Sequence, residues 1–357
     1  MASAVQMGQS TAAWHLRLRG AVLRCLFVPY LPDTPVSVGR RDAQVHTQRR
    51  QPSPLLPPLR MRRPASLRVT PLSRLGAEIT GISLRASLAN GPVAAQVRQA
   101  LDEHGLLLFR GQSDLKPEHH VELGSWFGTV FPLPPRFQHP RAPHADVLRM
   151  SNAEAEGLVG VGTTGWHMDG LSYATPFGVA LLHIAEVPRR GPTLFLPLHP
   201  LVETMRRQQP GWWERLSMRC GTGAAAVHHP LLFAHPRNRD RLGVCLGKTS
   251  GLVRDRGTAQ ERTLGEAEAA AALAKLDAHV ATHAEAHCYA HEWRAGDTLV
   301  VDNLQVAHLA PPETMLPPEN IGLRVLHRVV VAGAGALRGL HRVCRISKQG
   351  QYSTKPY

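Results

Sequence analysis

Trp166-His167-Met168-Asp169-Gly170 is the stretch around which the rest of the chain is organised. His167 and Asp169 are two residues apart, and on an extended strand such residues project to the same face. An imidazole and a carboxylate on one face can share a metal ion. The stretch therefore predicts two ligands of one metal site.

The third ligand is expected in residues 300–308, an apolar run that ends on the imidazole of His308. Two histidines and one carboxylate leave other positions on a metal open, as in non-heme Fe(II) oxygenases. Arg324 lies sixteen residues after His308, far enough for a loop and a returning antiparallel strand. A metal beside a fixed guanidinium suits a dicarboxylate that chelates at one end and forms a bidentate pair at the other.

Other histidines offer competing metal sites, because the chain contains 20 of them. The same His-x-acid spacing occurs at His120-x-Glu122, His144-x-Asp146 and His283-x-Glu285. His283, His287 and His291 would line one face if a helix continued through them, which suits zinc. We interpret these histidines, and His120, as solvated helix residues, and His144 with Asp146 as polar loop residues.

The layout of His167-x-Asp169, His308 and Arg324 resembles that of the 2-oxoglutarate-dependent dioxygenases of the taurine and 2,4-dichlorophenoxyacetate family. The resemblance spans about residues 66–335 and includes residues 69–81, 107–110, 126–128 and 229–230. Its most specific part is Trp293-x-x-Gly296-Asp297 leading into Asp302-Asn303 and His308. Leu304 is a departure, because the family usually has an arginine after the asparagine, and Pro192 replaces its usual acidic residue.

The resemblance implies a catalytic metal centre in which His167, Asp169 and His308 bind Fe(II). It implies that 2-oxoglutarate chelates the iron while Thr193 and Arg324 hold its distal carboxylate, with dioxygen in the remaining position. The reaction would release succinate and carbon dioxide and usually hydroxylate the substrate.

The resemblance also implies a small anionic organic substrate. Arg328 matches an arginine that binds a sulfonate or carboxylate in several relatives, and Arg136 offers a second cationic contact. Thr163 and Arg136 stand where taurine enzymes carry an asparagine and a tyrosine, so we do not expect taurine itself to be the substrate.

Two other functions remain open at this point. A cupin-like metal-binding protein without oxygenase activity, using zinc or manganese, would keep the three ligands but have no need of Arg324. A catalytically inactive scaffold that binds anionic metabolites is the second.

Short strands outnumber long helices in the sequence, which predicts a mainly β fold with helical insertions, a double-sheet jelly roll. The resemblance implies a cupin-like double-stranded β-helix with helices against one sheet. Strands are expected at residues 67–82, 106–109, 147–150, 177–184, 298–301 and 323–331. Helices are expected at residues 92–104, 117–127, 200–216 and 265–281.

The charge distribution predicts three parts in the chain. Residues 1–65 contain ten Arg, no Lys and two Asp, and so carry +8 of the formal net charge of +14. We interpret them as a disordered basic leader whose composition is typical of a transit peptide for a mitochondrion or chloroplast. If the leader is not a transit peptide, the expected location is the cytoplasm. A dioxygenase domain is expected at residues 66–345 and a C-terminal tail at residues 346–357.

Composition argues against several partners. Because the excess charge lies in the leader, no nucleic-acid partner is expected. The chain lacks an apolar run of about eighteen residues, so no membrane span is expected. Five cysteines without a CxxC pair argue against a disulfide framework and a zinc-thiolate site. A homo-oligomer is compatible with the sequence.

Overall fold

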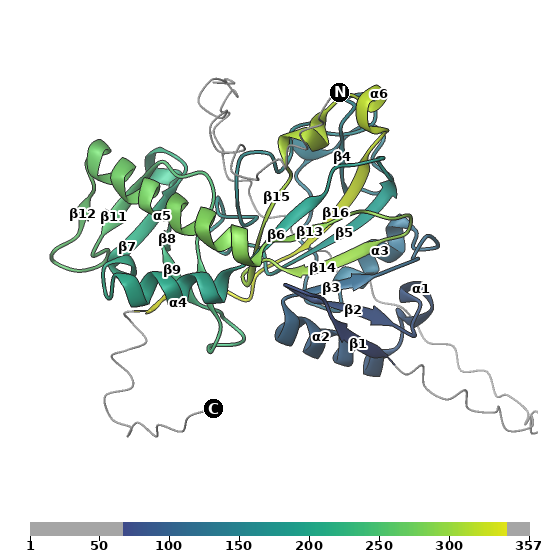
Figure 1. The fold of residues 1–357 in the computed structure, drawn as a ribbon, viewed down its shortest axis with the longest axis horizontal. Coiled ribbons are helices and arrows are strands. Elements are labelled where there is room, and N and C mark those ends of the chain that lie inside the picture. The colour runs from purple at the N-terminus through teal and green to yellow at the C-terminus, as the bar shows by residue number, and fades with distance from the viewer. Residues whose placement is uncertain (1–66, 341–357) are drawn as a thin grey trace, which may run out of the picture. The chain divides into compact units, whose positions relative to one another are not determined.

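The computed structural model describes residues 67–340 (Figure 1). The leader predicted for residues 1–65 and the tail predicted for residues 346–357 lie outside the described residues. None of the helices within residues 67–340 has the length and apolar character needed to cross a bilayer.

A seven-stranded sheet forms the centre of the fold. Its strands, in spatial order, are β1 (Arg68–Pro71), β2 (Ala77–Thr80), β3 (Leu106–Phe109), β14 (Thr298–Asp302), β5 (Val179–Glu186), β16 (Val325–Val331) and β4 (Leu148–Ser151). All neighbours are antiparallel except β2 and β3. Every residue of β3 and β14 is buried, because these strands, with apolar residues at 106–109 and 299–301, are covered on both faces.

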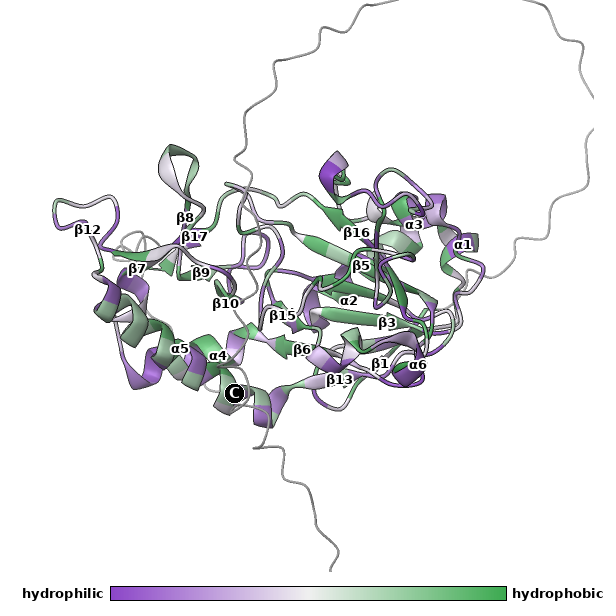
Figure 2. Ribbon diagram, turned by 90° about the horizontal axis from the view of Figure 1, so that it is seen from above, coloured by the Kyte–Doolittle hydropathy of each residue, from purple (hydrophilic) through white to green (hydrophobic). Residues whose placement is uncertain are grey.

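Helices cover one face of this sheet and a smaller sheet covers the other. The helices α2 (Gly91–His104) and α3 (Pro117–Gly124) pack through Leu101 and Leu123 into a core shared with Val300. On the opposite face lies a three-stranded sheet in the order β13 (Tyr289–His291), β6 (Thr193–Pro197) and β15 (Val306–Leu309). Phe195 and Val306 of this sheet pack in a second core with residues of the main sheet. Figure 2 shows hydrophobic residues along β3, β5 and β16.

The chain between β6 and β13, together with the later strand β17 (Arg338–Gly339), builds most of a third core. The helices are α4 (Leu198–Gln208) and α5 (Glu266–His287). One sheet has the order β12 (Arg262–Thr263), β11 (Gly251–Arg254), β7 (Leu216–Cys220) and β8 (Val227–Pro230). Another has the order β10 (Leu242–Val244), β9 (Leu232–Ala234) and β17. Trp213, Phe233 and Leu276 are central to this core. The shortest helices are α1 (Leu84–Ser87) and α6 (Pro318–Ile321).

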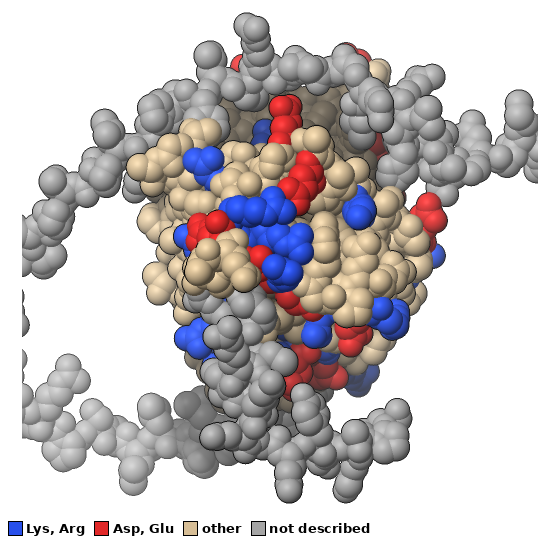
Figure 3. Space-filling view, turned by 90° about the vertical axis from the view of Figure 1, so that its left-hand side faces the viewer, with Lys and Arg blue, Asp and Glu red and all other residues tan. Residues whose placement is uncertain are grey.

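Arginines on or next to the β12-β11-β7-β8 sheet are paired with carboxylates of the same chain. Arg215 donates to both oxygens of Asp255, at 2.6 and 2.5 Å, and Arg262 donates to both oxygens of Glu268 at 2.7 Å. Figure 3 shows basic and acidic side chains lying against one another on one face of the molecule. These basic side chains are therefore neutralised locally.

The predicted mainly β fold with helices is confirmed, with corrections at several ends. The helix expected to reach residue 216 ends at Gln208, since Pro210 follows closely, and Leu216 begins β7. The helix expected to end at residue 281 continues to His287. The prediction that His120 is solvated is wrong: only 1% of it is exposed, because α3 packs that side onto the main sheet.

Candidate metal centre

His167, Asp169 and His308 lie together although 141 residues separate the first from the last. One ligand atom of each residue lies within 4.8 Å of those of the other two. Nε2 of His308 is 3.6 Å from Oδ2 of Asp169, and the two imidazole centroids are 4.3 Å apart. Within residues 67–340 they form the only group of three His, Cys, Asp or Glu residues with the spacing of a metal site.

Backbone pairing positions the two histidines. The amide of His167 donates to the His308 carbonyl at 3.1 Å, and the amide of His308 donates back at 3.0 Å. His167 is extended only in this isolated bridge, and the chain turns at Asp169. Nδ1 of His167 lies 2.8 Å from the Gly165 carbonyl, to which it donates, leaving Nε2 as the ligand atom.

Asn303 braces the segment that carries Asp169. Its Oδ1 accepts from the Asp169 amide at 2.8 Å, and its Nδ2 donates to the carbonyls of Asp169 at 3.0 Å and Phe177 at 2.7 Å. Asn303 follows β14 and is 1% exposed. The sequence analysis used Asn303 only as part of the resemblance. The sequence signal that could have identified this role is the position of Asn303, a polar residue directly after the apolar run of a buried strand.

Burial and nearby charges keep Asp169 and His308 in their metal-binding forms. Burial raises the pKa of Asp169, but the guanidinium of Arg328 and the two histidines outweigh it, so the pKa lies below its ordinary value. Burial, followed by the nearby His167, lowers the pKa of His308 to about 3. At neutral pH the centre therefore presents a carboxylate and, at His308, a neutral imidazole.

Arg328 contacts the metal-site carboxylate directly. It lies on β16, and its Nη1 donates to Oδ1 of Asp169 at 2.9 Å and to Oδ2 at 2.7 Å. The structure thus places this predicted substrate-binding residue beside a predicted metal ligand.

Arg324 is a buried cation close to Thr193. It is 2% exposed, and its Nη2 lies 3.4 Å from Oγ1 of Thr193. Its buried Nε has no hydrogen-bond partner among residues 67–340. Burial lowers its pKa to about 10, so it stays charged. Trp293 also donates to Oγ1 of Thr193, at 3.0 Å. Thr193 lies on β6 two residues from Phe195, which pairs with His308 in the same sheet.

The remaining predicted substrate residues lie in loops. Arg136 is exposed in a 3-10 turn, and its guanidinium lies 4.8 Å from the ring centroid of its neighbour Phe137. Oγ1 of Thr163 donates to the Gly160 carbonyl at 2.9 Å. None of the hydrogen bonds or ion pairs described for residues 67–340 joins Arg136 or Thr163 to the three ligands.

The competing histidine cluster does not form. The helix ends at His287, and His291 lies instead on β13. His283 is buried rather than solvated, and its Nε2 lies 3.0 Å from the Pro197 carbonyl. Nε2 of His291 lies 3.2 Å from Oδ2 of the buried Asp297.

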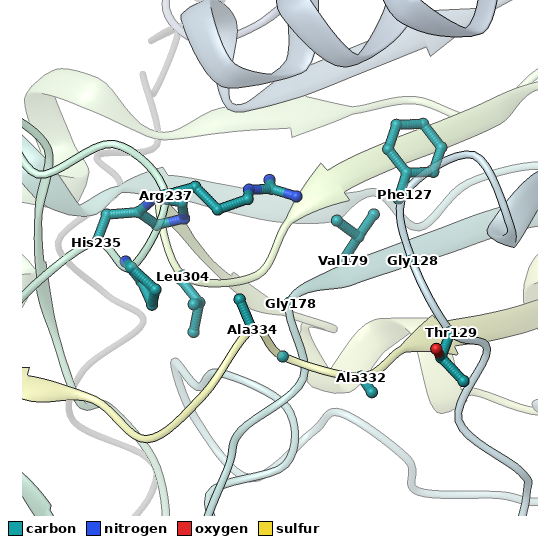
Figure 4. Close-up of a pocket in the computed structure, with 12 residues that line it drawn as sticks. Phe127, Gly128, Thr129, Gly178, Val179, His235, Arg237, Leu304, Ala332 and Ala334 are labelled. Atoms are coloured by element: carbon teal, nitrogen blue, oxygen red, sulfur yellow. The ribbon is translucent and has the colours of Figure 1, made fainter. Parts of the chain in front are cut away.

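A cavity of about 240 Å³ is lined by His235 and Arg237 among others (Figure 4), and none of the three ligands is among its lining residues. Arg237, which lines it, has Nη2 3.2 Å from Oδ2 of Asp302 and 3.1 Å from Oδ1 of Asp102. Nε2 of His235 lies 3.2 Å from Oδ2 of Asp302. Leu304, which departs from the family pattern, is 3% exposed and packs in the third core. Leu304 brings no charge to this cavity, whereas Arg237 brings a guanidinium.

The chain matches the family model described as taurine catabolism dioxygenase TauD, TfdA family over residues 68–330. It is 26% identical to pentalenolactone F synthase of Streptomyces arenae, over 68% of this chain and 89% of that protein. It is 24% identical to an alkylsulfatase of Acinetobacter baylyi, over 73% and 83% of the two chains. A taurine dioxygenase structure from Burkholderia xenovorans aligns with a TM-score of 0.63 at 26% identity, covering 77% of this chain and 92% of that one.

Proposed function

We propose, because the chain belongs to the TauD, TfdA family of Fe(II)- and 2-oxoglutarate-dependent dioxygenases, that it oxidises a small anionic organic substrate, with hydroxylation as the outcome. Succinate and carbon dioxide would be released in the same reaction. The observation that carries this proposal is the buried cation of Arg324, whose Nε has no partner within residues 67–340, in a fold that also gathers two imidazoles and one carboxylate.

The three ligands fit iron. Two histidines and one carboxylate are the donor set of non-heme Fe(II) oxygenases. His167, Asp169 and His308 would hold the ion, with Nδ1 of His167 and the backbone of Asp169 held in place by Gly165 and Asn303. When bound, iron and 2-oxoglutarate supply the oxidising chemistry by consuming dioxygen.

The residues around Arg324 fit a dicarboxylate. A buried guanidinium with an unpartnered Nε is costly unless an anion pairs with it, and guanidinium groups bind carboxylates in bidentate geometry. Arg324 would bind the distal carboxylate, and Thr193 would add a hydrogen bond. Both residues are buried, which would limit the access of water to the bound carboxylate.

The substrate is expected to carry a sulfonate, sulfate or carboxylate. Within the described part of the chain, the buried Nε of Arg328 has no hydrogen-bond partner, and Arg328 lies beside Asp169, where a substrate would approach the metal. Arg136 and Thr163 are retained as proposed substrate contacts from flanking loops. The names of the two relatives, pentalenolactone F synthase and alkylsulfatase, support an organic substrate of this broad kind.

The main sheet and the β13-β6-β15 sheet together are proposed to form the double-stranded β-helix of the family. The domain at residues 66–345, the tail at residues 346–357 and organellar targeting by residues 1–65 likewise stand as proposals.

The test is succinate formation from 2-oxoglutarate with Fe(II) and ascorbate, with and without a panel of sulfonates, alkyl sulfates and carboxylates. Substrate-stimulated succinate is expected, and it should be lost in Arg324→Ala. Iron that binds without producing succinate under any condition would favour the cupin-like metal-binding protein without oxygenase activity.

A further inference from the structure

Arg328 and Asp169 form a close ion pair in partly buried surroundings. A single nitrogen, Nη1, donates to both carboxylate oxygens, at 2.9 and 2.7 Å. The side chains of Arg328 and Asp169 are 15% and 11% exposed. Screening by solvent is therefore weak at this pair.

The same carboxylate is a proposed metal ligand, so a divalent cation there would lie close to a positive guanidinium. Two cations at such distances in a partly buried site repel each other appreciably. The single negative charge of Asp169 would then have to neutralise both the guanidinium of Arg328 and the metal ion. While Arg328 is directed at Asp169, it opposes metal binding.

Arg328 also has donors left over. Its Nε is buried without a hydrogen-bond partner, and no hydrogen bond of its Nη2 is described within residues 67–340. An anion that pairs with these donors would neutralise the guanidinium and reduce its repulsion of the metal.

We propose that Arg328 couples the two binding events, so that a substrate anion paired with Arg328 tightens metal binding at His167, Asp169 and His308. This inference rests on the proposed function for the identity of the metal site. Binding linkage is reciprocal, so the metal tightens the anion by the same factor.

The test measures Mn(II) affinity of the full chain by the electron paramagnetic resonance signal of free Mn(II), without 2-oxoglutarate. Arg328→Gln removes the charge but retains a hydrogen-bond donor, and Arg328→Met removes both. Each is expected to bind Mn(II) roughly tenfold more tightly than the unaltered chain, because a nearby positive charge has gone. Arg328→Lys, which keeps the charge, should stay close to the unaltered chain.

The second measurement adds ethanesulfonate as the anion probe. It should tighten Mn(II) binding to the unaltered chain severalfold and have no effect on Arg328→Gln. Arg149→Gln is the matched control: Arg149 lies on the neighbouring β4 and pairs with Glu156 instead of Asp169. It should retain both the Mn(II) affinity and the ethanesulfonate effect.

Weaker or unchanged Mn(II) binding in both Arg328→Gln and Arg328→Met would overturn the inference, because Arg328 would then only hold Asp169 in place. An ethanesulfonate effect that persists in Arg328→Gln would also overturn it. Neither measurement involves turnover. Tighter Mn(II) binding in a chain that never produces succinate would therefore support the coupling while refuting the proposed reaction.

Discussion

The hydroxyl oxygen of Thr193 faces two hydrogen-bond donors. Nε1 of Trp293 donates to it at 3.0 Å, and Nη2 of Arg324 lies 3.4 Å away. A hydroxyl has two acceptor positions and one proton. The Thr193 proton is thus available to an anion paired with Arg324, which gives Trp293 a positioning role in the proposed co-substrate pocket.

Replacing Arg324 should affect 2-oxoglutarate more than the primary substrate. Arg324→Ala is expected to weaken 2-oxoglutarate binding by roughly 2 to 5 kcal/mol, since the distal carboxylate would be buried without its charged partner. Titration of 2-oxoglutarate into Mn(II)-loaded protein measures this. Arg328→Ala is the comparison and should mainly weaken the primary substrate. If the two effects are exchanged, the assigned roles of the arginines are reversed.

At the scale of elements, the end of β14 holds the metal-site segment through one side chain. Asn303 makes three hydrogen bonds of 2.7 to 3.0 Å to the backbone around Asp169 and Phe177. Because β14 is buried in the main sheet, Asn303 is anchored on a rigid element, and its hydrogen bonds restrict the movement of the Asp169 backbone.

Asn303→Ala should destabilise the fold by about 2 to 3 kcal/mol, because buried backbone groups would lose their partners. It should also weaken Mn(II) binding, since Asp169 is no longer braced. Urea unfolding and Mn(II) titration measure the two effects. Asn320→Ala, at an exposed position, is the control. Unchanged metal affinity in folded Asn303→Ala would contradict the bracing role.

A second interaction between elements joins α3, β5 and β16. His183 and His327 are register partners on β5 and β16, and the ring centroid of His120 on α3 is 5.9 Å from that of His183. Burial is the main cause that lowers the pKa of His183 and of His327 to about 4 each. Burial followed by these two neighbours lowers the pKa of His120 well below its ordinary value.

This cluster predicts acid sensitivity. An unfolded histidine has a pKa near 6.5, so between about pH 6.5 and 4 the unfolded chain binds more protons than the folded one. Stability should therefore fall as the pH falls through that window, by roughly 3 kcal/mol for each fully independent histidine. Urea unfolding at pH 7 and pH 5 tests this. His183→Gln should flatten the dependence, whereas His139→Gln, in an exposed loop, should leave it unchanged. Equal slopes in both variants would contradict the assignment.

At the scale of the whole molecule, the metal centre joins segments that lie far apart in the chain. His167 and Asp169 precede β5, whereas His308 lies on β15 and Arg328 on β16. The small sheet therefore provides one ligand, and the main sheet provides the neighbouring cation. A bound ion would link these segments.

Mn(II) should accordingly stabilise the folded chain. At a free concentration one hundred times its Kd, the expected gain is about 2.7 kcal/mol, seen as a higher Tm. His308→Ala should abolish this gain, because one imidazole of the three-ligand set is lost. Thermal melts with and without Mn(II), followed by a chelator, measure it. Full metal affinity in folded His308→Ala would discredit its assignment as a ligand.

Much of the fold could be predicted from local patterns. The apolar run Leu106–Phe109 is a strand at the expected residues, and the helical period before it ends at His104 as predicted. The end of α4 at Gln208 had a local signal in Pro210, whereas the end of α5 at His287 was less predictable, because packing against the third core decides how far that helix continues. The burial of His120 could not be predicted, since a single polar residue does not change the helical pattern around it.

The sequence by itself determined the types and spacing of the candidate ligands, because His167-x-Asp169 and the apolar run before His308 are local features of the chain. Only the tertiary structure decided that Arg328 pairs with Asp169 and that Arg324 is buried against Thr193. These partners lie more than 100 residues apart in sequence, and strand alternation specifies a face but no partner. The packing of the two sheets and of the turn at Asp169 against one another selects the partner.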